Sequence, residues 1–387
     1  MSVMRATPHG RPFRVLYVTE SVPNRDPERG DGSSLIPYEV VQAFPETVSV
    51  NLLTFAGPVA VPSPVRARCD RVETLPTRSG AAATAALLTG REAGEELRRT
   101  ARARSTARAW SHEADVTLLH GPHVAFLAHD VVGAVVLQTV DPWSIRLAME
   151  ARIASGWRAR YRSLRAARSL RRERRLPSAT RLLTVGEADA QRWSAALGRP
   201  VRAIPNGATV VRRAVRTAAD PVICFVGSLN YGPNVESART LVREVLPRVR
   251  AEVPAVRVVV AGRQPGDEVL ALSGDGVEVR GNVASVAEVF AAADVAVFVD
   301  RSGVGIRNSV TEALAAGLPV VATPVAAREQ PGHPRLWVEA DVAAVANRVV
   351  AVLTSPAGDD TQEVVSSGRT WSDAAADYLE ELQLACG

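Results

Sequence analysis

The pattern of short apolar runs along the chain constrains its fold more than any other feature of the sequence. These runs recur from end to end and are separated by stretches with helical spacing. Such alternation predicts parallel sheets covered by helices. The predicted strands are 13–19, 48–54, 115–119, 134–139, 181–185, 221–226, 256–261, 276–279, 294–299 and 318–322. The predicted helices are 34–44, 91–111, 143–175, 235–250, 284–292, 309–316, 340–353 and 371–384.

The alternation occurs twice, with a turn signal at 205–207 (Pro-Asn-Gly) between the two halves. A length of 387 residues also fits two domains. We therefore expect an α/β protein with two Rossmann-like, doubly wound domains, 1–205 and 206–370. The last segment, 371–387, should be a helix that packs back on the first domain. Two such sheets would face each other across a cleft at the carboxyl ends of their strands, where open α/β sheets bind ligands.

The basic residues exclude whole reaction classes. All 46 of them are arginine, and the sequence contains no lysine. A Walker-type phosphate loop requires a lysine, as do pyridoxal-phosphate and Schiff-base enzymes. Any phosphate must therefore be bound by arginine, by backbone N–H groups or by a helix N-terminus.

Several other partners are not expected from the sequence. The three cysteines, Cys69, Cys224 and Cys386, lie far apart, which argues against a disulfide framework or zinc ribbon and favours a reducing cytoplasm. No apolar run approaches the roughly 18 residues of a membrane span. Aromatic residues are only 5% and no nucleic-acid module is visible. No Asp-x-Asp pair follows a predicted strand and there is no H-E-x-x-H, so we expect no metal and no cofactor.

The segment 300–316 is the strongest candidate for ligand binding. A strand ends there, a loop containing Gly303 and Gly305 follows, and a helix begins near Ser309. Glycines allow a ligand to approach the backbone, and a helix N-terminus attracts anions. Arg307 adds a cation, so the pattern predicts a diphosphate site. Glu312 could accept hydrogen bonds from ribose hydroxyls; the alternative is a capping box in which it bonds the N–H of Ser309.

These residues resemble the donor domain of glycosyltransferase family 4. The resemblance is carried by FVGSLNYGPN (225–234), AGRQP (261–265), VRGNV (279–283) and the segment 293–329. It is strongest to a subgroup with the pattern G-x-G-I-x-N-K-V-x-E-A, in which Ser309 replaces the lysine. It covers 180–380 well and the first half only through its first strand and loop. Members have the GT-B architecture and transfer sugars from nucleotide diphosphate donors with retention of configuration.

The resemblance implies a set of donor-binding residues. The loop and helix start would contact the diphosphate and the donor sugar, and Glu312 would hold the ribose. The segment around Asn282 and Val283 would flank the nucleobase, and Gly227 would let the backbone approach the phosphates. The full set is Gly227, Ser228, Arg263, Asn282, Val283, Gly303, Val304, Gly305, Ile306, Arg307, Asn308, Ser309 and Glu312.

Two positions depart from the family pattern. Val304 stands where many members have the first glutamate of a Glu-x7-Glu pair. Ser228 and a residue near Pro233 stand where an arginine and a lysine often neutralise the diphosphate. We expect Arg263 and Arg307 to supply the missing charge; the alternative for each is a solvated arginine.

The first domain is expected to bring the acceptor and any catalytic side chain. His120 and His123 follow the strand 115–119, and family members often place a histidine near the donor sugar there; a structural role is the alternative. Asp141 follows the strand 134–139, where it could instead cap the next helix. Gly30 and Gly32 lie in a loop that could close over the acceptor or form a plain surface turn.

The segment 146–181 carries twelve arginines and two glutamates. A charge-rich helix usually presents a solvated face, and this is the main expectation. The alternatives are an anionic acceptor or weak contact with a membrane surface.

Together these features predict a metal-independent hexosyltransferase that moves a sugar from a nucleotide diphosphate donor to a hydroxyl or amine of a small molecule or glycan. Two alternatives stay open: a nucleotide-sugar epimerase, and a non-catalytic accessory protein of the same fold.

Overall fold

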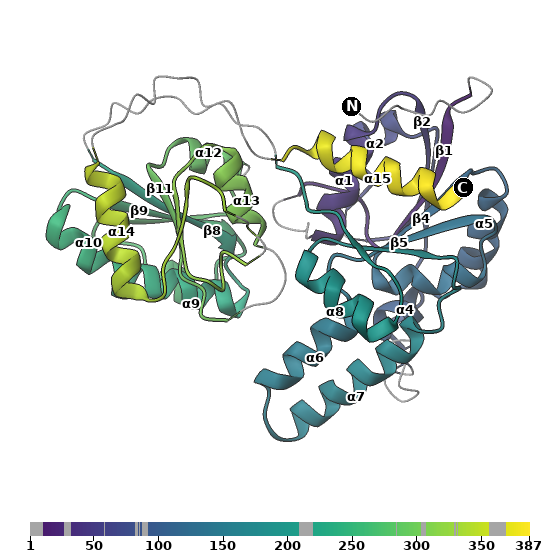
Figure 1. The fold of residues 1–387 in the computed structure, drawn as a ribbon, viewed down its shortest axis with the longest axis horizontal. Helices are drawn as coiled ribbons and strands as arrows, with labels where there is room; N and C mark the ends of the chain where they lie inside the picture. The colour runs from purple at the N-terminus through teal and green to yellow at the C-terminus, as the bar shows by residue number, and fades with distance from the viewer. Residues whose placement is uncertain are drawn as a thin grey trace. The chain divides into compact units, whose positions relative to one another are not determined.

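The computed structural model describes residues 11–26, 32–57, 59–81, 84, 86, 92–208, 220–283, 285–302, 307–328, 330, 332–355 and 369–387. The chain divides into two units (Figure 1). Unit 1 comprises Met1–Pro205 and Trp371–Gly387, and unit 2 comprises Asn206–Thr370. Each unit contains one parallel sheet.

Unit 1 is built on a seven-stranded sheet with the order β3-β2-β1-β4-β5-β6-β7. Because β1 has β2 on one side and β4 on the other, the winding direction reverses between β1 and β4, the point where open sheets bind ligands. The strands are β1 (Phe13–Thr19), β2 (Val48–Phe55), β3 (Arg71–Leu75), β4 (Val116–His120), β5 (Ala134–Gln138), β6 (Arg181–Thr184) and β7 (Arg202–Ala203).

Nine helices accompany this sheet in the described part of unit 1. They are α1 (Gly32–Ala43), α2 (Ser63–Arg68), α4 (Ala93–Arg98), α5 (Ala101–Ser111), the 3-10 helix η1 (Pro122–His129), α6 (Trp143–Ile153), α7 (Gly156–Glu173), α8 (Glu187–Leu197) and α15 (Trp371–Cys386).

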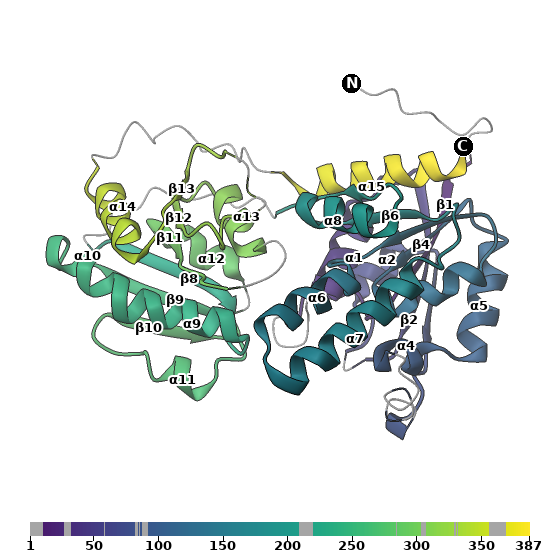
Figure 2. The same cartoon turned by 60° about the horizontal axis from the view of Figure 1, so that its bottom comes forward.

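Helix α15 returns to unit 1, as predicted, and packs on α1, β4 and β5 (Figure 2). Its buried face includes Tyr378 and Leu382. The Glu381 carboxylate is only 1% exposed and accepts a hydrogen bond from Arg181 at 2.7 Å. Helix α15 therefore covers the core of unit 1 and supplies the buried carboxylate that pairs with Arg181.

Unit 2 is built on a six-stranded sheet with the order β10-β9-β8-β11-β12-β13. Its central strands are almost entirely apolar, as expected for strands that are buried on both faces. The strands are β8 (Val222–Ser228), β9 (Arg257–Arg263), β10 (Val277–Gly281), β11 (Val295–Phe298), β12 (Val320–Ala322) and β13 (Leu336–Val338). The helices are α9 (Gly232–Thr240), the π-helix η2 (Leu241–Val245), α10 (Leu246–Glu252), α11 (Asp267–Leu270), α12 (Val286–Ala291), α13 (Asn308–Ala315) and α14 (Val342–Thr354).

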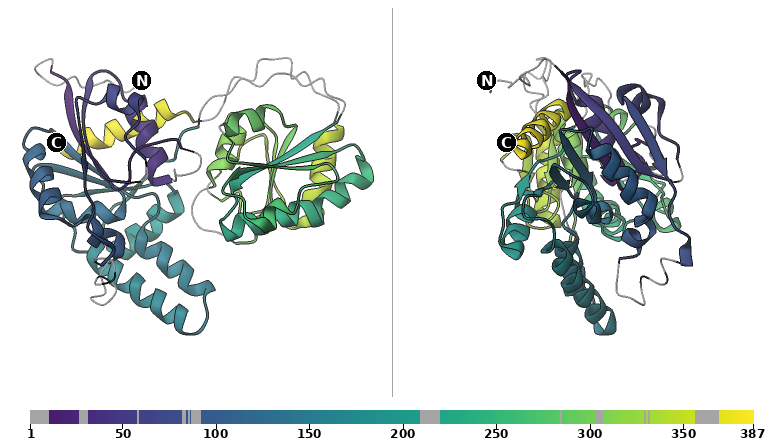
Figure 3. Two further views of the ribbon diagram at one scale, coloured as in Figure 1. Left: turned by 180° about the vertical axis from the view of Figure 1, so that it is seen from behind. Right: turned by 90° about the vertical axis from the view of Figure 1, so that its right-hand side faces the viewer.

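Two long predicted helices are each broken in the structure. The stretch 91–111 divides into α4 and α5, because the Thr100 side chain caps α5 by accepting a bond from the N–H of Ala103. The stretch 143–175 divides into α6 and α7 at Gly156, whose φ of +59° favours glycine. The two helices pack on each other as a hairpin that projects from the rest of unit 1 (Figure 3).

Candidate functional site

A row of three glycines crosses the carboxyl edge of the unit 2 sheet. Gly227 on β8 pairs with Gly262 on β9, which pairs with Gly281 on β10. A Cβ atom on Gly262 would lie 1.7 Å from the carbonyl oxygen of Gly227. One on Gly227 would lie 2.9 Å from the side-chain nitrogen Nδ2 of Asn234. Gly262 leaves no room for a side chain, and none of the three residues carries one, so backbone lines this edge, where a ligand can approach it closely.

Ser228 and Arg263 follow this row and are themselves paired in register. The Nε of Arg263 donates to the Oγ of Ser228 at 2.7 Å, and the N–H of Leu229 donates to the carbonyl of Arg263 at 2.8 Å. Arg263 is half-buried and forms no ion pair with any residue in the described ranges. The structure thus holds a half-buried cation at the carboxyl edge of β9, beside the glycine row.

Asn282 closes the turn on the other side of the row. Its N–H donates to the carbonyl of Gly262 at 2.7 Å, and its Oδ1 accepts from the N–H of Gln264 at 2.8 Å. Both Asn282 and Gln264 have φ of +51°, a left-handed conformation that costs Gln264 about 1–2 kcal/mol and that asparagine tolerates better. Val283, the next residue, packs partly buried against the unit 2 core. Strained backbone is therefore concentrated at the end of β9 and β10.

Arg307 is placed differently from the sequence-based expectation. Its guanidinium is only 11% exposed and donates to Asp300 at 2.5 Å and to Asn234 at 2.9 Å. Its central carbon also lies over the rings of Phe225 and Phe298, 5.0 and 4.6 Å from their centroids. Burial lowers the pKa of Arg307, while Asp300 opposes this shift. Because Asp300 neutralises the charge inside the unit, Arg307 is not the free phosphate-binding cation that we expected.

The helix that follows begins at Asn308. Arg307 is its N-cap and makes no side-chain capping bond, so Ser309 lies in the first turn and is not the cap that the capping-box alternative requires. The Oδ1 of Asn308 accepts a bond from Asn206 at 2.9 Å. Glu312 is half-buried, outside the buried face of α13. The predicted loop residues Gly303, Val304, Gly305 and Ile306 lie outside the described residues.

In unit 1, His120 ends β4 but its side chain is fully buried. Its Nδ1 lies 3.3 Å from the hydroxyl of Tyr17, on the sheet face against which α15 packs. Tyr17 is itself fully buried, which raises the pKa of its hydroxyl well above the ordinary value, with a smaller contribution from Tyr378. A side chain enclosed in the core does not reach a substrate, so the structure argues against the predicted catalytic role of His120.

His123 is the more accessible histidine of the pair. Its Nδ1 lies 3.0 Å from Glu20, which also accepts the His123 backbone N–H at 3.0 Å. Its ring packs edge-on against Trp143. Burial would raise the pKa of Glu20, but the contacts with His123 and Arg98 outweigh it and the pKa is lowered. Gly121 is required here, because a Cβ on it would lie 2.2 Å from the Glu20 carboxyl carbon.

Asp141 lies after β5, as predicted. Burial raises its pKa; Arg146, 3.9 Å away, opposes the shift and Asp189 adds to it. The alternative role as a helix cap is not seen, because Pro142 is the N-cap of α6 and no side chain caps it. Asp141 is therefore a carboxyl group with a raised pKa at the carboxyl edge of the sheet, where open α/β sheets bind ligands, and such shifts are frequent at functional sites.

The loop after β1 reaches the same region. Gly32 begins α1, and a Cβ on it would lie 3.4 Å from the side chain of Val140, the residue before Asp141. Gly30 lies outside the described residues.

Unit 1 also contains a cavity of about 320 Å³ next to His123 and Trp143. Its wall combines aromatic and apolar groups with carboxylates and guanidinium groups. The lining includes His123, Trp143, Phe126, Trp193, Glu92 and Glu173.

Neither a cluster of metal ligands nor a membrane-spanning helix is found in the part of the chain that the structure describes. No three His, Cys, Asp or Glu side chains gather there in a way that would hold a metal ion. None of its helices combines the length and the apolar character that crossing a bilayer requires.

Comparison with known proteins bears on the unit that carries the glycine row. Residues 220–355 match the family model of the glycosyl transferases group 1. The match runs from β8 to the end of α14 and so includes the glycine row, Arg263 and α13. No curated protein sequence matches the chain significantly.

Solved structures match nearly the whole chain in fold. Alr3699/HepE from Anabaena, in complex with UDP and glucose, is 14% identical with a TM-score of 0.59, covering 96% of this chain and 95% of that one. Sucrose-phosphate synthase from Thermosynechococcus elongatus is 15% identical with a TM-score of 0.60, covering 97% and 96%. A UDP-forming trehalose-phosphate synthase from Burkholderia xenovorans, in complex with glucose-6-phosphate, is 12% identical with a TM-score of 0.60, covering 96% and 100%. These similarities confirm the predicted fold, two Rossmann-like domains of the GT-B type.

Proposed function

We propose that this protein is a glycosyltransferase that transfers a hexose from a nucleotide diphosphate donor to a hydroxyl or amine of an acceptor. The observation that carries the proposal is the backbone-lined edge at Gly227, Gly262 and Gly281, with Arg263 beside it. This edge lies inside the segment that matches the group 1 family model. The comparison proteins solved with UDP or with glucose-6-phosphate support the same substrate classes.

In this proposal the donor diphosphate lies along the glycine row. Arg263 provides the cation, and its bond to Ser228 fixes the direction of the guanidinium. The first N–H groups of α13 provide further donors, which is how helix N-termini bind phosphates. Glu312 holds the ribose hydroxyls and the segment after Asn282 flanks the nucleobase. Gly303, Val304, Gly305 and Ile306 complete the contacts to the diphosphate and sugar.

Arg307 takes a positioning role. Its bonds to Asp300 and Asn234 tie the start of α13 to the region between β8 and α9. It therefore sets where the helix N-terminus points, while Arg263 carries the charge that meets the phosphates.

The chemistry follows from where charge develops. As the bond to the sugar breaks, negative charge grows on the leaving diphosphate, and donors already aimed there stabilise the transition state more than the ground state. We propose that no divalent metal takes part and that the acceptor attacks from the face the diphosphate leaves, so that configuration is retained. The donor is a substrate and no further cofactor is proposed.

Unit 1 is proposed to bind the acceptor. Asp141, with its raised pKa, and His123, held by Glu20, replace His120 as the side chains that contact it. The loop that contains Gly30 and Gly32 would close over it. The three free cysteines fit a cytoplasmic location.

The decisive experiment measures product formation from a panel of nucleotide sugars with the full chain. A transferase releases nucleoside diphosphate and glycosylates an acceptor, or slowly hydrolyses the donor when no acceptor is present. An epimerase would change the donor sugar without releasing nucleotide, and an accessory protein would do neither. Binding of nucleoside diphosphates should raise the melting temperature. The absence of such binding across uridine, guanosine, adenosine and thymidine diphosphates would refute the proposal.

A further inference from the structure

The α6–α7 hairpin carries more arginines than its ion pairs with acidic side chains account for. Residues 143–173, which form the hairpin, contain nine arginines and two glutamates. Both glutamates already have partners: Glu150 accepts from Arg146, and Glu173 accepts from Trp193 of α8 at 2.8 Å. The surplus positive charge on the hairpin is therefore not balanced by its own acidic residues.

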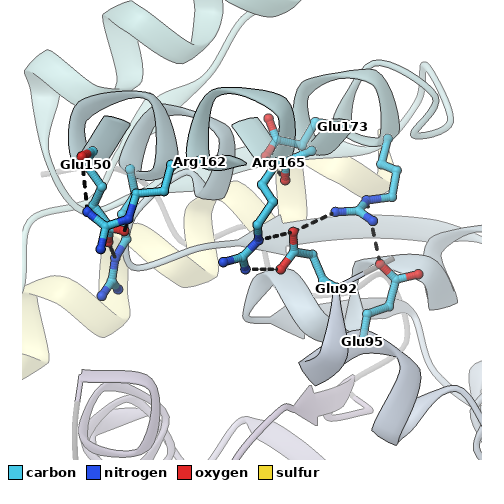
Figure 4. A network of polar contacts seen from close by, with 9 residues as sticks. Glu92, Glu95, Glu150, Arg162, Arg165 and Glu173 are labelled. Atoms are coloured by element: carbon cyan, nitrogen blue, oxygen red, sulfur yellow. Dashed lines mark hydrogen bonds and ion pairs between the residues drawn. The ribbon is translucent and has the colours of Figure 1, made fainter. Parts of the chain in front are cut away.

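The inner face of α7 is fixed by a separate ionic network (Figure 4). Glu92 accepts from Arg165 and lies 3.5 Å from Arg172, whose guanidinium also approaches Glu95 at 3.9 Å. These contacts anchor α7 to the start of α4. Arg165 also lies 5.7 Å from the ring centroid of Tyr161, so the network reaches the edge of the neighbouring exposed side of α7, which we call the outer face.

That outer face presents an apolar stripe. Trp157, Tyr161 and Leu164 are 72%, 41% and 49% exposed. Their spacing of four and three residues places them on one side of the helix. Trp157 stands in the first turn of α7, next to the α6–α7 connection at the end of the projecting hairpin (Figure 3). Large apolar side chains gathered on a projecting surface mark a contact with a partner.

Arginines continue the same face. At about 100° per residue, Arg160, Arg168 and Arg171 fall within roughly 60° of Trp157 around the helix axis. Arg160 and Arg171 are exposed and Arg168 is half-buried, and none of the three forms an ion pair with a residue that the structure describes. The outer face of α7, defined by these six residues, thus combines aromatic and aliphatic groups with available cations.

We propose that the outer face of α7 binds the surface of an anionic lipid bilayer. Tryptophan and tyrosine favour the region between headgroups and acyl chains, while arginines bind lipid phosphates and extend their stems over apolar surface. A polyanion such as RNA would use the arginines but would give Leu164 no apolar environment. The inference rests on α7 alone and does not depend on the enzymatic reaction.

The test is co-sedimentation of the full chain with vesicles of phosphatidylcholine alone or mixed with phosphatidylglycerol. We expect binding only to the mixed vesicles and weaker binding as salt is raised. The triple variant R160Q/R168Q/R171Q should bind on the order of a hundredfold more weakly, at roughly fivefold for each arginine near an anionic surface. The double variant W157S/Y161S should lose at least roughly tenfold through the lost apolar contact.

A matched control removes the same charge elsewhere. R243Q/R248Q/R257Q changes three exposed arginines of unit 2 and should bind like the unaltered chain. Circular dichroism of every variant verifies folding. Failure of the unaltered chain to bind anionic vesicles at low salt would overturn the proposal. It would also be overturned if W157S/Y161S bound normally while RNA competed fully, since α7 would then be a general polyanion surface.

Discussion

The glycine row allows a sharp test in the substitution Gly262→Ala. The added Cβ would lie 1.7 Å from the carbonyl oxygen of Gly227, whereas carbon–oxygen contacts close at about 3.3 Å. Backbone cannot rotate away as a side chain can. The ends of β8 and β9 must therefore separate by about 1.6 Å, the difference between the two distances.

A shift of the end of β9 would strain two hydrogen bonds, one toward β8 and one toward β10. The N–H of Leu229 donates to Arg263 at 2.8 Å, and the N–H of Asn282 donates to Gly262 at 2.7 Å. At about 1 kcal/mol for each bond, with backbone strain added, the free energy of unfolding should fall by about 2–3 kcal/mol. A displacement of an ångström or more at a binding edge should also weaken nucleoside diphosphate binding by about a hundredfold.

Urea denaturation followed by circular dichroism gives the first quantity, and a titration with nucleoside diphosphates gives the second. Gly266→Ala is the matched control, since a Cβ there meets nothing within 4 Å and the backbone has φ of −78°. The reasoning is refuted if Gly262→Ala keeps both the stability and the affinity of the unaltered chain.

Three further outcomes are expected. Arg263→Gln should weaken nucleoside diphosphate binding by about tenfold or more, because a charged hydrogen bond to the phosphate is lost. Arg257→Gln is the control and should not weaken it. Equal effects of the two substitutions in the titration would count against the phosphate role of Arg263. Asp300→Asn should lower the free energy of unfolding by about 3 kcal/mol, because Arg307 is left as a buried unpaired cation; an unchanged urea midpoint would contradict this. The pKa of Glu20 is lowered in the folded chain, so its ionised form stabilises the fold. This stabilisation is fully present above the ordinary pKa of 4.5 and is lost as the pH falls through the folded-state pKa. Glu20→Gln should therefore be less stable at neutral pH and lose less stability on acidification, which melting temperatures across the acidic range would show.

Most strands of the two sheets could be predicted, because buried parallel strands appear in the sequence as continuous apolar runs. Phe13–Thr19 has the bounds predicted from such a run. Three strands gave no such signal. Arg71–Leu75 is largely exposed, and Arg202–Ala203 and Leu336–Val338 are too short to show a pattern.

The candidate site was predictable only where local sequence decides the geometry. Gly227 and Asn282 were found from motifs, but the pairing of Gly227 with Gly262 is a matter of strand register, which the motifs do not state. The direction of Arg307 depends on Asn234, which is far away in the sequence. The sequence around His120 and His123 does not show which side of the strand α15 covers, so it could not distinguish the buried histidine from the accessible one.

The return of α15 to the first unit has a consequence for how the chain matures. Residues 206–370 form unit 2 as one uninterrupted segment, whereas unit 1 needs residues from both sides of it. On the ribosome, the sheet of unit 1 emerges early, but Tyr378, Leu382 and Glu381, which cover its core, are translated only after unit 2. The apolar surface of unit 1 that α15 covers therefore stays exposed while unit 2 is synthesised. Loss of α15 should expose the same surface permanently and promote aggregation, even though every strand is intact.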